Sequence, residues 1–236
     1  MLTPEQIREG TFLLFDKPKF WTSFDVVAKV RRVLMEYCNE KKLKVGHAGT
    51  LDPLATGLLI LATGKFTKRI DEIQATDKTY AGTFYLGATT PSYDGETKTE
   101  EHTSTEDITD EKIIAVAKKF TGEIMQVPPV HSAIKQDGKS VYLKARAGKE
   151  VILEARKISI HRFEITKINL PEVEFLVECS KGTYIRSLAN DLGKELGCGA
   201  YLFALSRTKI GAYDLKNALD VHEFLHTYKI KEEKKN

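Results

Sequence analysis

The sequence predicts an α+β fold, built on a mixed, mainly antiparallel central sheet flanked by helices. Short apolar segments typical of strands and longer segments with amphipathic helical spacing both occur along the 236-residue chain. The two kinds of segment do not alternate one by one, as they do in a doubly wound parallel sheet. No internal repeat is evident, so a repeat architecture is not expected.

Strands are expected where short apolar or alternating segments are bounded by turn residues. The first, TFLLF, is closed by Asp16, Lys17 and Pro18, and the second is a continuous apolar run, which indicates a buried strand. The expected strands cover residues 11–15, 57–62, 79–86, 157–168 and 173–179.

Helices are expected where apolar residues recur at helical spacing behind a capping residue. Thr22 or Ser23 caps the first helix, and Gly197 ends the fourth. Between these elements, the polar segment 88–107 is expected to be a long loop. The expected helices cover residues 22–37, 66–73, 110–120, 186–196 and 220–228.

Residues 122–152 differ from the rest of the chain, because prolines, glycines and many lysines and arginines gather there. We interpret this segment as a basic flap inserted into a catalytic domain of residues 1–213. A short helix and a charged tail are expected over residues 214–236. The composition alone leaves open whether the flap binds an anionic surface or is a solvated hairpin.

Composition excludes several classes of protein. Hydrophobic residues make up 42% and charged residues 29% of the chain, which argues against disorder, and the net charge of +3 is too small to identify a nucleic-acid-binding protein. No segment predicts a membrane span or a secretory leader. Cys38, Cys179 and Cys198 are odd in number and widely spaced, so we expect reduced thiols in a cytoplasmic protein rather than disulfides or a zinc site.

The most informative segment is residues 44–59, which place one carboxylate in a loop of turn-forming residues just before an apolar run. Its glycines permit backbone conformations and close approaches that other residues do not. Pro53 fixes the backbone after Asp52 and biases Asp52 itself toward an extended conformation. An aspartate before proline is, by itself, usually a turn or capping residue. In this setting Asp52 is also a candidate nucleophile.

Four blocks of the sequence resemble the TruB family of tRNA pseudouridine synthases. The first, GHAGTLDPLATG at residues 46–57, is similar to the family's catalytic motif without a gap. The others follow in the family's order and spacing: residues 77–80 leading to Gly87 and Asp94, residues 126–135 and residues 179–189. The resemblance extends over about residues 11–213 and implies a short form without the C-terminal RNA-binding (PUA) domain of longer relatives.

The resemblance implies the pseudouridine synthase fold and the conversion of uridine 55 (in tRNA numbering) in the T arm to pseudouridine. This isomerisation, an intramolecular transfer, is expected to need no cofactor or metal. The base leaves its sugar at N1, turns and reattaches through C5, so the enzyme needs a nucleophile, a site that retains the free base and a group that takes the C5 proton. The implied partner is tRNA, and we expect a monomer without an obligate protein partner.

The same resemblance assigns roles to single residues. Asp52 is the nucleophile, and attack on C1′, attack on C6 and assistance of glycal formation all stay open. Arg186 matches the arginine that pairs with this aspartate, and Tyr80 matches the tyrosine that stacks on the target base and is a candidate for C5 proton transfer. His47 matches the histidine proposed to fill the space of the flipped nucleotide. The remaining matches in the family's active cleft are Lys68 and Asp94.

Local geometry adds one expectation. Residues two apart in an extended segment project from the same face. We therefore expect Tyr184 and Arg186 to line one pocket, and likewise Lys78 and Tyr80.

Three other functions are weighed against this one. A guide-RNA-dependent synthase of the related archaeal and eukaryotic branch is disfavoured by the basic flap and by the expected absence of a C-terminal domain. A non-catalytic tRNA-binding or folding protein predicts loss of Asp52 or Arg186, and both are present. A carboxylate-based hydrolase is disfavoured because no second acidic residue accompanies Asp52 in its motif.

Overall fold

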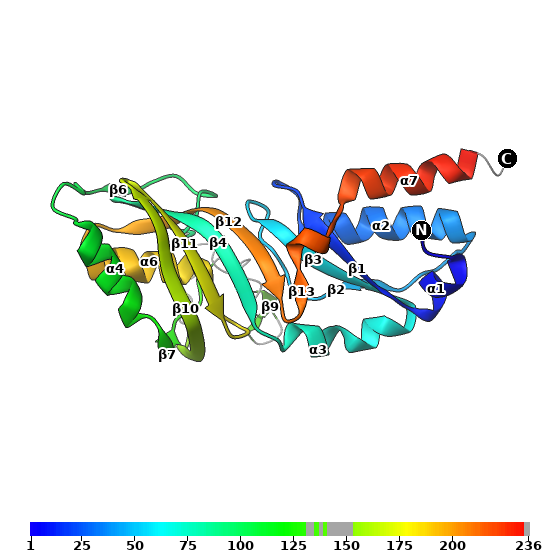
Figure 1. Ribbon diagram of the computed structural model, residues 1–236, viewed down its shortest axis with the longest axis horizontal. Helices are drawn as coiled ribbons and strands as arrows, with labels where there is room; N and C mark the ends of the chain where they lie inside the picture. The colour runs from blue at the N-terminus through cyan, green and yellow to red at the C-terminus, as the bar shows by residue number, and fades with distance from the viewer. Residues whose placement is uncertain (131–134, 137–138, 141–152, 234–236) are drawn as a thin grey trace. The chain divides into compact units, whose positions relative to one another are not determined.

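The computed structural model describes residues 1–130, 135–136, 139–140 and 153–233 (Figure 1). The chain forms two compact units, Met1–Tyr80 with Ser206–Asn236, and Ala81–Leu205. Strands β4 (Lys78–Leu86) and β12 (Ala200–Ile210) each contribute residues to both units. Much of the expected flap lies outside the described residues.

The first unit is built on strands β1 and β3. β1 (Phe12–Lys17) pairs antiparallel with β3 (Thr56–Thr63) and parallel with β14 (Leu219–Asp220). β3 also pairs antiparallel with β2 (Val45–His47) and parallel with β12. The short strand β13 (Tyr213–Asp214) pairs with the end of β12, and η2 (Leu215–Asn217) follows it.

Helices cover both faces of these strands, because the strand residues alternate between two apolar clusters. One cluster packs α2 (Ser23–Cys38) and α7 (Val221–Glu233), which run side by side in Figure 1, against Leu13 and Phe15. α2 begins in a capping box made by Thr22 and Asp25. The other cluster holds Ile73, which lies on α3 (Ile70–Gln74). The remaining helices of this unit are α1 (Pro4–Glu9) and η1 (Gly64–Arg69).

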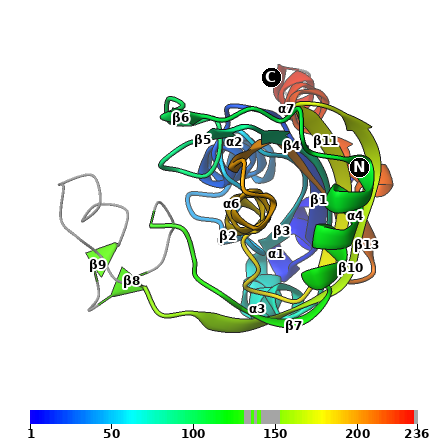
Figure 2. The same ribbon diagram turned by 90° about the vertical axis from the view of Figure 1, so that its left-hand side faces the viewer.

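The second unit continues with the strand order β12, β4, β11 (Glu172–Cys179), β10 (Arg156–Asn169) and β7 (Gly122–Gln126). β10 pairs antiparallel with both of its neighbours. The rings of Phe84 and Phe175 stack in its core with centroids 4.0 Å apart. Helix α4 (Asp110–Lys119) lies alongside β10 (Figure 2). Most residues of α6 (Ile185–Leu196) are buried. Two small ribbons complete the unit: β5 (Ala88–Thr89) with β6 (Glu101–His102), and β8 (Lys135–Gln136) with β9 (Lys139–Ser140).

The predicted fold class is confirmed, since the pairings are mixed and mainly antiparallel and helices flank the sheet. Some boundaries differ. Residues 66–73 are a 3-10 helix followed by one α-helical stretch, and the loop at 88–107 contains the ribbon β5–β6. Residues 122–126, placed in the flap by composition, form the sheet strand β7. None of the helices in the described ranges has the length and apolar composition needed to cross a membrane.

Candidate active site

Hydrogen bonds fix the loop that carries Asp52 on both sides of the carboxylate. The N–H of Leu51 donates to Ser23 Oγ at 2.9 Å, and Ser23 Oγ donates to the carbonyl of Leu51 at 3.2 Å. The carbonyl of Pro53 accepts the N–H of Phe20 at 2.7 Å. Asp52 itself is half-buried, and its carbonyl accepts the N–H of Ala55 at 3.1 Å. The loop therefore holds the Asp52 backbone in place between the start of α2 and the start of β3.

Arg207 supports this loop through hydrogen bonds to its backbone carbonyls. Its side chain is buried, and its guanidinium donates to the carbonyls of Leu58 at 2.9 Å, Gly49 at 3.1 Å and Thr50 at 3.4 Å. Arg207 reaches this position because its backbone pairs with Gly57 across β12 and β3. A Cβ at Gly57 would lie 2.5 Å from the Arg207 carbonyl oxygen, so glycine is required for this approach.

Lys17 is a second buried cation beside the loop. Its Nζ donates to the carbonyls of Trp21 at 2.6 Å, Pro18 at 2.9 Å and Pro53 at 3.4 Å. Burial lowers the pKa of Lys17 from 10.5 to about 8, while the negative charge of Asp52 acts in the opposite direction. Lys17 thus ties the residue after Asp52 to the turn between β1 and α2.

The lowered pKa of Lys17 predicts a pH-dependent stability. Between about pH 8 and 10.5, Lys17 binds more protons in the unfolded chain than in the folded one, so its contribution to the free energy of unfolding rises with pH. We expect the difference in unfolding free energy between wild type and Lys17→Met to be larger near about pH 10 than near about pH 7.5. Urea titrations of both proteins at the two pH values measure this difference. A difference that stays constant or shrinks would contradict the lowered pKa.

His47 lies on β2 and is half-buried. Burial lowers the pKa of His47, and the charge of Arg207 acts in the same direction. Within the described part of the chain, no hydrogen bond reaches the buried Nδ1 atom. Burial therefore favours the uncharged form of this ring, five positions before Asp52.

Tyr80 and Lys68 occupy different settings in the same unit. Tyr80 is half-buried on β4, and Lys68 is exposed on η1. Lys78 is on the same strand face as Tyr80 but is buried, and its Nζ donates to the carbonyls of Gln74 and Thr76. Lys78 thus secures the end of α3.

In the second unit, Asp94 and Arg186 form a buried ion pair, with 3.7 Å between Oδ2 and Nε. Asp94 Oδ1 also accepts from Ser92 Oγ at 2.6 Å and from the N–H of Glu96 at 2.9 Å. Arg186 in turn donates to the carbonyl of Ser92 at 3.3 Å. The structure therefore brings together two residues that the sequence placed in separate blocks.

Tyr184 and Arg186 do not share an extended segment, so the same-face argument does not apply to them. Tyr184 is the N-cap of α6, and Arg186 is already in the first turn, where successive side chains rotate by about 100°. The buried side chain of Gln126 holds Tyr184 through both backbone groups, accepting from its N–H at 2.8 Å and donating to its carbonyl at 3.1 Å. Ser187 Oγ adds a bond to the carbonyl of Val127 at 2.7 Å. The residues that open the flap are thus tied to the start of α6.

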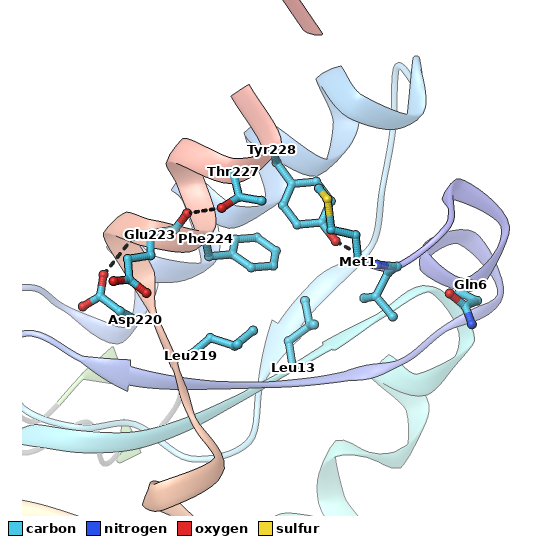
Figure 3. A pocket seen from close by; sticks show the side chains of 10 residues that line it. Met1, Gln6, Leu13, Leu219, Asp220, Glu223, Phe224, Thr227 and Tyr228 are labelled. Carbon is cyan, nitrogen blue, oxygen red and sulfur yellow. Dashed lines mark hydrogen bonds between the residues drawn. The ribbon is translucent and has the colours of Figure 1, made fainter. Parts of the chain in front are cut away.

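A separate cavity in the first unit holds none of these site residues (Figure 3). Its volume is about 540 Å³, and the carboxylates of Asp220 and Glu223 lie at its lining beside Phe224 and Tyr228. Two carboxylates disfavour a phosphate-bearing ligand. The loop of Asp52, held by two buried cations, is the better candidate for a site that acts on an anionic substrate.

Sequence reasoning missed Lys17, Ser23, Gln126 and Arg207 as supports of the site. A signal existed for Lys17, because the alternation of β1 puts it on the same face as the buried residues Leu13 and Phe15. Arg207 carried no local signal, since its role depends on pairing with a strand far away in the sequence. Among the described residues, no group of three or more metal-ligating side chains comes together.

The fold resembles that of two solved structures. One, titled as the crystal structure of a Cbf5–Nop10–Gar1 complex, matches with a TM-score of 0.75 and 30% identity over 100% of this chain and 59% of the other. The second, an H/ACA RNP bound to a substrate RNA containing 2′-deoxyuridine, matches with a TM-score of 0.71 and 28% identity over 99% and 59%. The chain spans about three fifths of the chains in these structures.

Family models match nearly the whole sequence. The N-terminal domain of TruB family pseudouridylate synthase covers residues 33–185, and the C-terminal domain of tRNA pseudouridylate synthase B covers residues 186–236. These two matches identify the chain as a pseudouridylate synthase. The chain belongs to the TruB family.

Two curated relatives match this chain over at least 92% of their length. A Flavobacterium johnsoniae protein named tRNA pseudouridine synthase B is 56% identical over 94% of this chain and 98% of that protein. A Phocaeicola vulgatus protein of the same name is 50% identical over 92% of each chain.

Proposed function

We propose that this chain converts uridine 55 in the T arm of tRNA to pseudouridine, with Asp52 as the nucleophile. The observation that carries the proposal is the alignment with tRNA pseudouridine synthase B over 98% of the length of the Flavobacterium johnsoniae relative. The Asp52 loop supports it, because two buried cations fix the loop and favour negative charge beside it.

The reaction rearranges bonds within one nucleotide. The bond between N1 and C1′ breaks, a bond between C5 and C1′ forms, the C5 proton leaves and N1 gains a proton. Asp52 provides the carboxylate for attack on C1′ or C6, or for glycal formation. The uridine must leave its stacked position first, because its reacting atoms are not accessible within the folded arm.

We carry the other roles over from the family motif. Arg186 is proposed to orient and stabilise the Asp52 carboxylate, while Tyr80 stacks on the target base and is the candidate for C5 proton transfer. His47, whose uncharged form is favoured by burial, is proposed to fill the space that the flipped nucleotide leaves. The proposed substrate contacts are completed by Lys68, Asp94 and Tyr184. The ion pair of Asp94 with Arg186 supports a positioning role for Asp94.

The proposal extends to partners and location. The flap is proposed to close on tRNA phosphates as part of a catalytic domain of residues 1–213, acting as a monomer without a cofactor. A cytoplasmic location is supported by Cys38, Cys179 and Cys198, which are all buried free thiols.

A guide-RNA-dependent reaction is the second candidate, because the Cbf5 complex has a related fold. The match to that chain covers 59% of its length at 30% identity, whereas the tRNA pseudouridine synthase B relatives match nearly end to end. This difference favours direct recognition of tRNA.

The test is tritium release from a tRNA transcript labelled at C5 of its uridines. We expect the purified protein, with no other RNA or protein present, to release close to one tritium per tRNA. A matched transcript with cytidine at position 55 should release none. Release that requires a guide RNA would favour the second candidate, and binding without release would favour a non-catalytic tRNA-binding protein.

A further inference from the structure

Phe20 is the most exposed of the large apolar side chains in the described ranges, with 73% of its surface accessible. An exposed phenylalanine adds little to the stability of the fold, because its ring is not removed from water. Its location is therefore informative. Phe20 lies in the short turn between β1 and α2, next to the loop of Asp52.

The backbone of Phe20 is held in an unfavourable conformation. Its φ is 69°, in the left-handed region that a bulky residue rarely adopts. The N–H of Phe20 donates to the carbonyl of Pro53 at 2.7 Å, and Lys17 bonds the carbonyls of Pro18 and Trp21 on either side. These contacts fix the backbone of Phe20 relative to Pro53, the residue that follows Asp52. A strained residue whose side chain does not serve the core points to a role in binding.

The surroundings of the ring are cationic and aromatic. Lys19 Nζ lies 5.3 Å from the centroid of Phe20, and Lys29 Nζ lies 4.9 Å from the ring of Trp21. Phe24, in the first turn of α2, is also exposed, at 64%. Exposed rings with neighbouring lysines are typical of surfaces that stack on unpaired bases and neutralise the adjoining phosphates.

We propose that Phe20 is a stacking platform for an unpaired base of the T loop, close to the nucleotide that reaches Asp52, with Lys19 on a neighbouring phosphate. This inference rests on the proposed function, because the stacked base belongs to the same RNA. Phe20 is a binding residue in this account and takes no part in the bond rearrangement.

The test compares Phe20→Asn with wild type on a T-arm hairpin, because asparagine tolerates the left-handed backbone but has no ring to stack. We expect KM to rise about tenfold and kcat to change by less than about twofold, since stacking on one base is worth about a factor of ten. Phe20→Trp, which keeps an aromatic face, should restore the wild-type KM. An unchanged urea midpoint in Phe20→Asn would show that the rise in KM does not come from unfolding.

A matched control is Ile114→Asn, which removes an exposed apolar side chain from α4 and should leave KM unchanged. Hairpins with one abasic T-loop nucleotide at a time then locate the base. At the stacked position, the abasic change should raise KM for wild type but add nothing further for Phe20→Asn.

The outcomes separate this inference from the proposed function. If wild type releases tritium but Phe20→Asn keeps the wild-type KM, or if every abasic change affects both proteins equally, the stacking inference is wrong. If wild type releases no tritium from the hairpin or from tRNA, the proposed function itself fails.

Discussion

Replacing Asp52 with asparagine is expected to lower the turnover of tRNA by about 10⁴-fold or more, as loss of an essential reacting carboxylate does in other enzymes. Asparagine keeps the shape of the side chain, and the loop is held by bonds to the backbone of its neighbours. Affinity for the T-arm hairpin should therefore stay within about threefold, because the lost interaction belongs to the transition state. Single-turnover tritium release and equilibrium binding measure the two quantities.

The matched control for this prediction is Asp71→Asn, which removes an exposed carboxylate from α3 in the same unit. Its turnover should stay within about twofold of wild type. An Asp52→Asn protein that retains more than about a tenth of wild-type turnover would contradict the assignment of Asp52 as nucleophile.

Replacing Arg207 with methionine is expected to lower the free energy of unfolding by about 3 kcal/mol, because a buried guanidinium and its bonds are lost together. The carbonyls of Gly49, Thr50 and Leu58 would each lose the donor that the buried side chain of Arg207 provides. The loop of Asp52 should loosen as a result, so turnover should fall as well. Urea titration measures the change in stability.

Arg32→Met is the control for Arg207. Arg32 is 80% exposed in its pair with Glu36 on α2, so the same substitution should cost no more than about 0.5 kcal/mol. Equal costs at the two positions would show that the buried bonds of Arg207 do not support the loop.

The fold was predictable where local patterns agree with tertiary contacts. The cap at Thr22 and the valine face of α2 were visible in the sequence, and so was the glycine that ends α6. β12 was missed because its burial does not alternate regularly: Phe203 is exposed, whereas Arg207 is buried. β7 was not predicted as a strand, because the flap-like composition of the residues after it led us to place it in the flap. The structure pairs it with β10. α7 continues past residue 228 because lysine and glutamate there are good helix formers.

The site was predictable in part, for a related reason. The motif around Asp52 is contiguous in the sequence. Its glycines and proline therefore already indicate that the Asp52 carboxylate lies in a loop of defined conformation. Its supports come from distant segments: Lys17 from the end of β1 and Arg207 from β12. A buried lysine or arginine is uncommon. Only the pairing of the strands shows that backbone carbonyls accept hydrogen bonds from its charged group. The ion pair of Asp94 with Arg186 likewise depends on a tertiary contact, because Asp94 lies in a loop that is distant in sequence from α6.

The most direct test of the central claim is to compare tritium release with pseudouridine formed in the same tRNA. After reaction, the tRNA is digested to nucleosides and pseudouridine is quantified by chromatography. We expect one pseudouridine for each tritium released with wild type, located at position 55, and neither product with Asp52→Asn. Pseudouridine formed at the wild-type rate by Asp52→Asn, or tritium released without pseudouridine, would contradict the account.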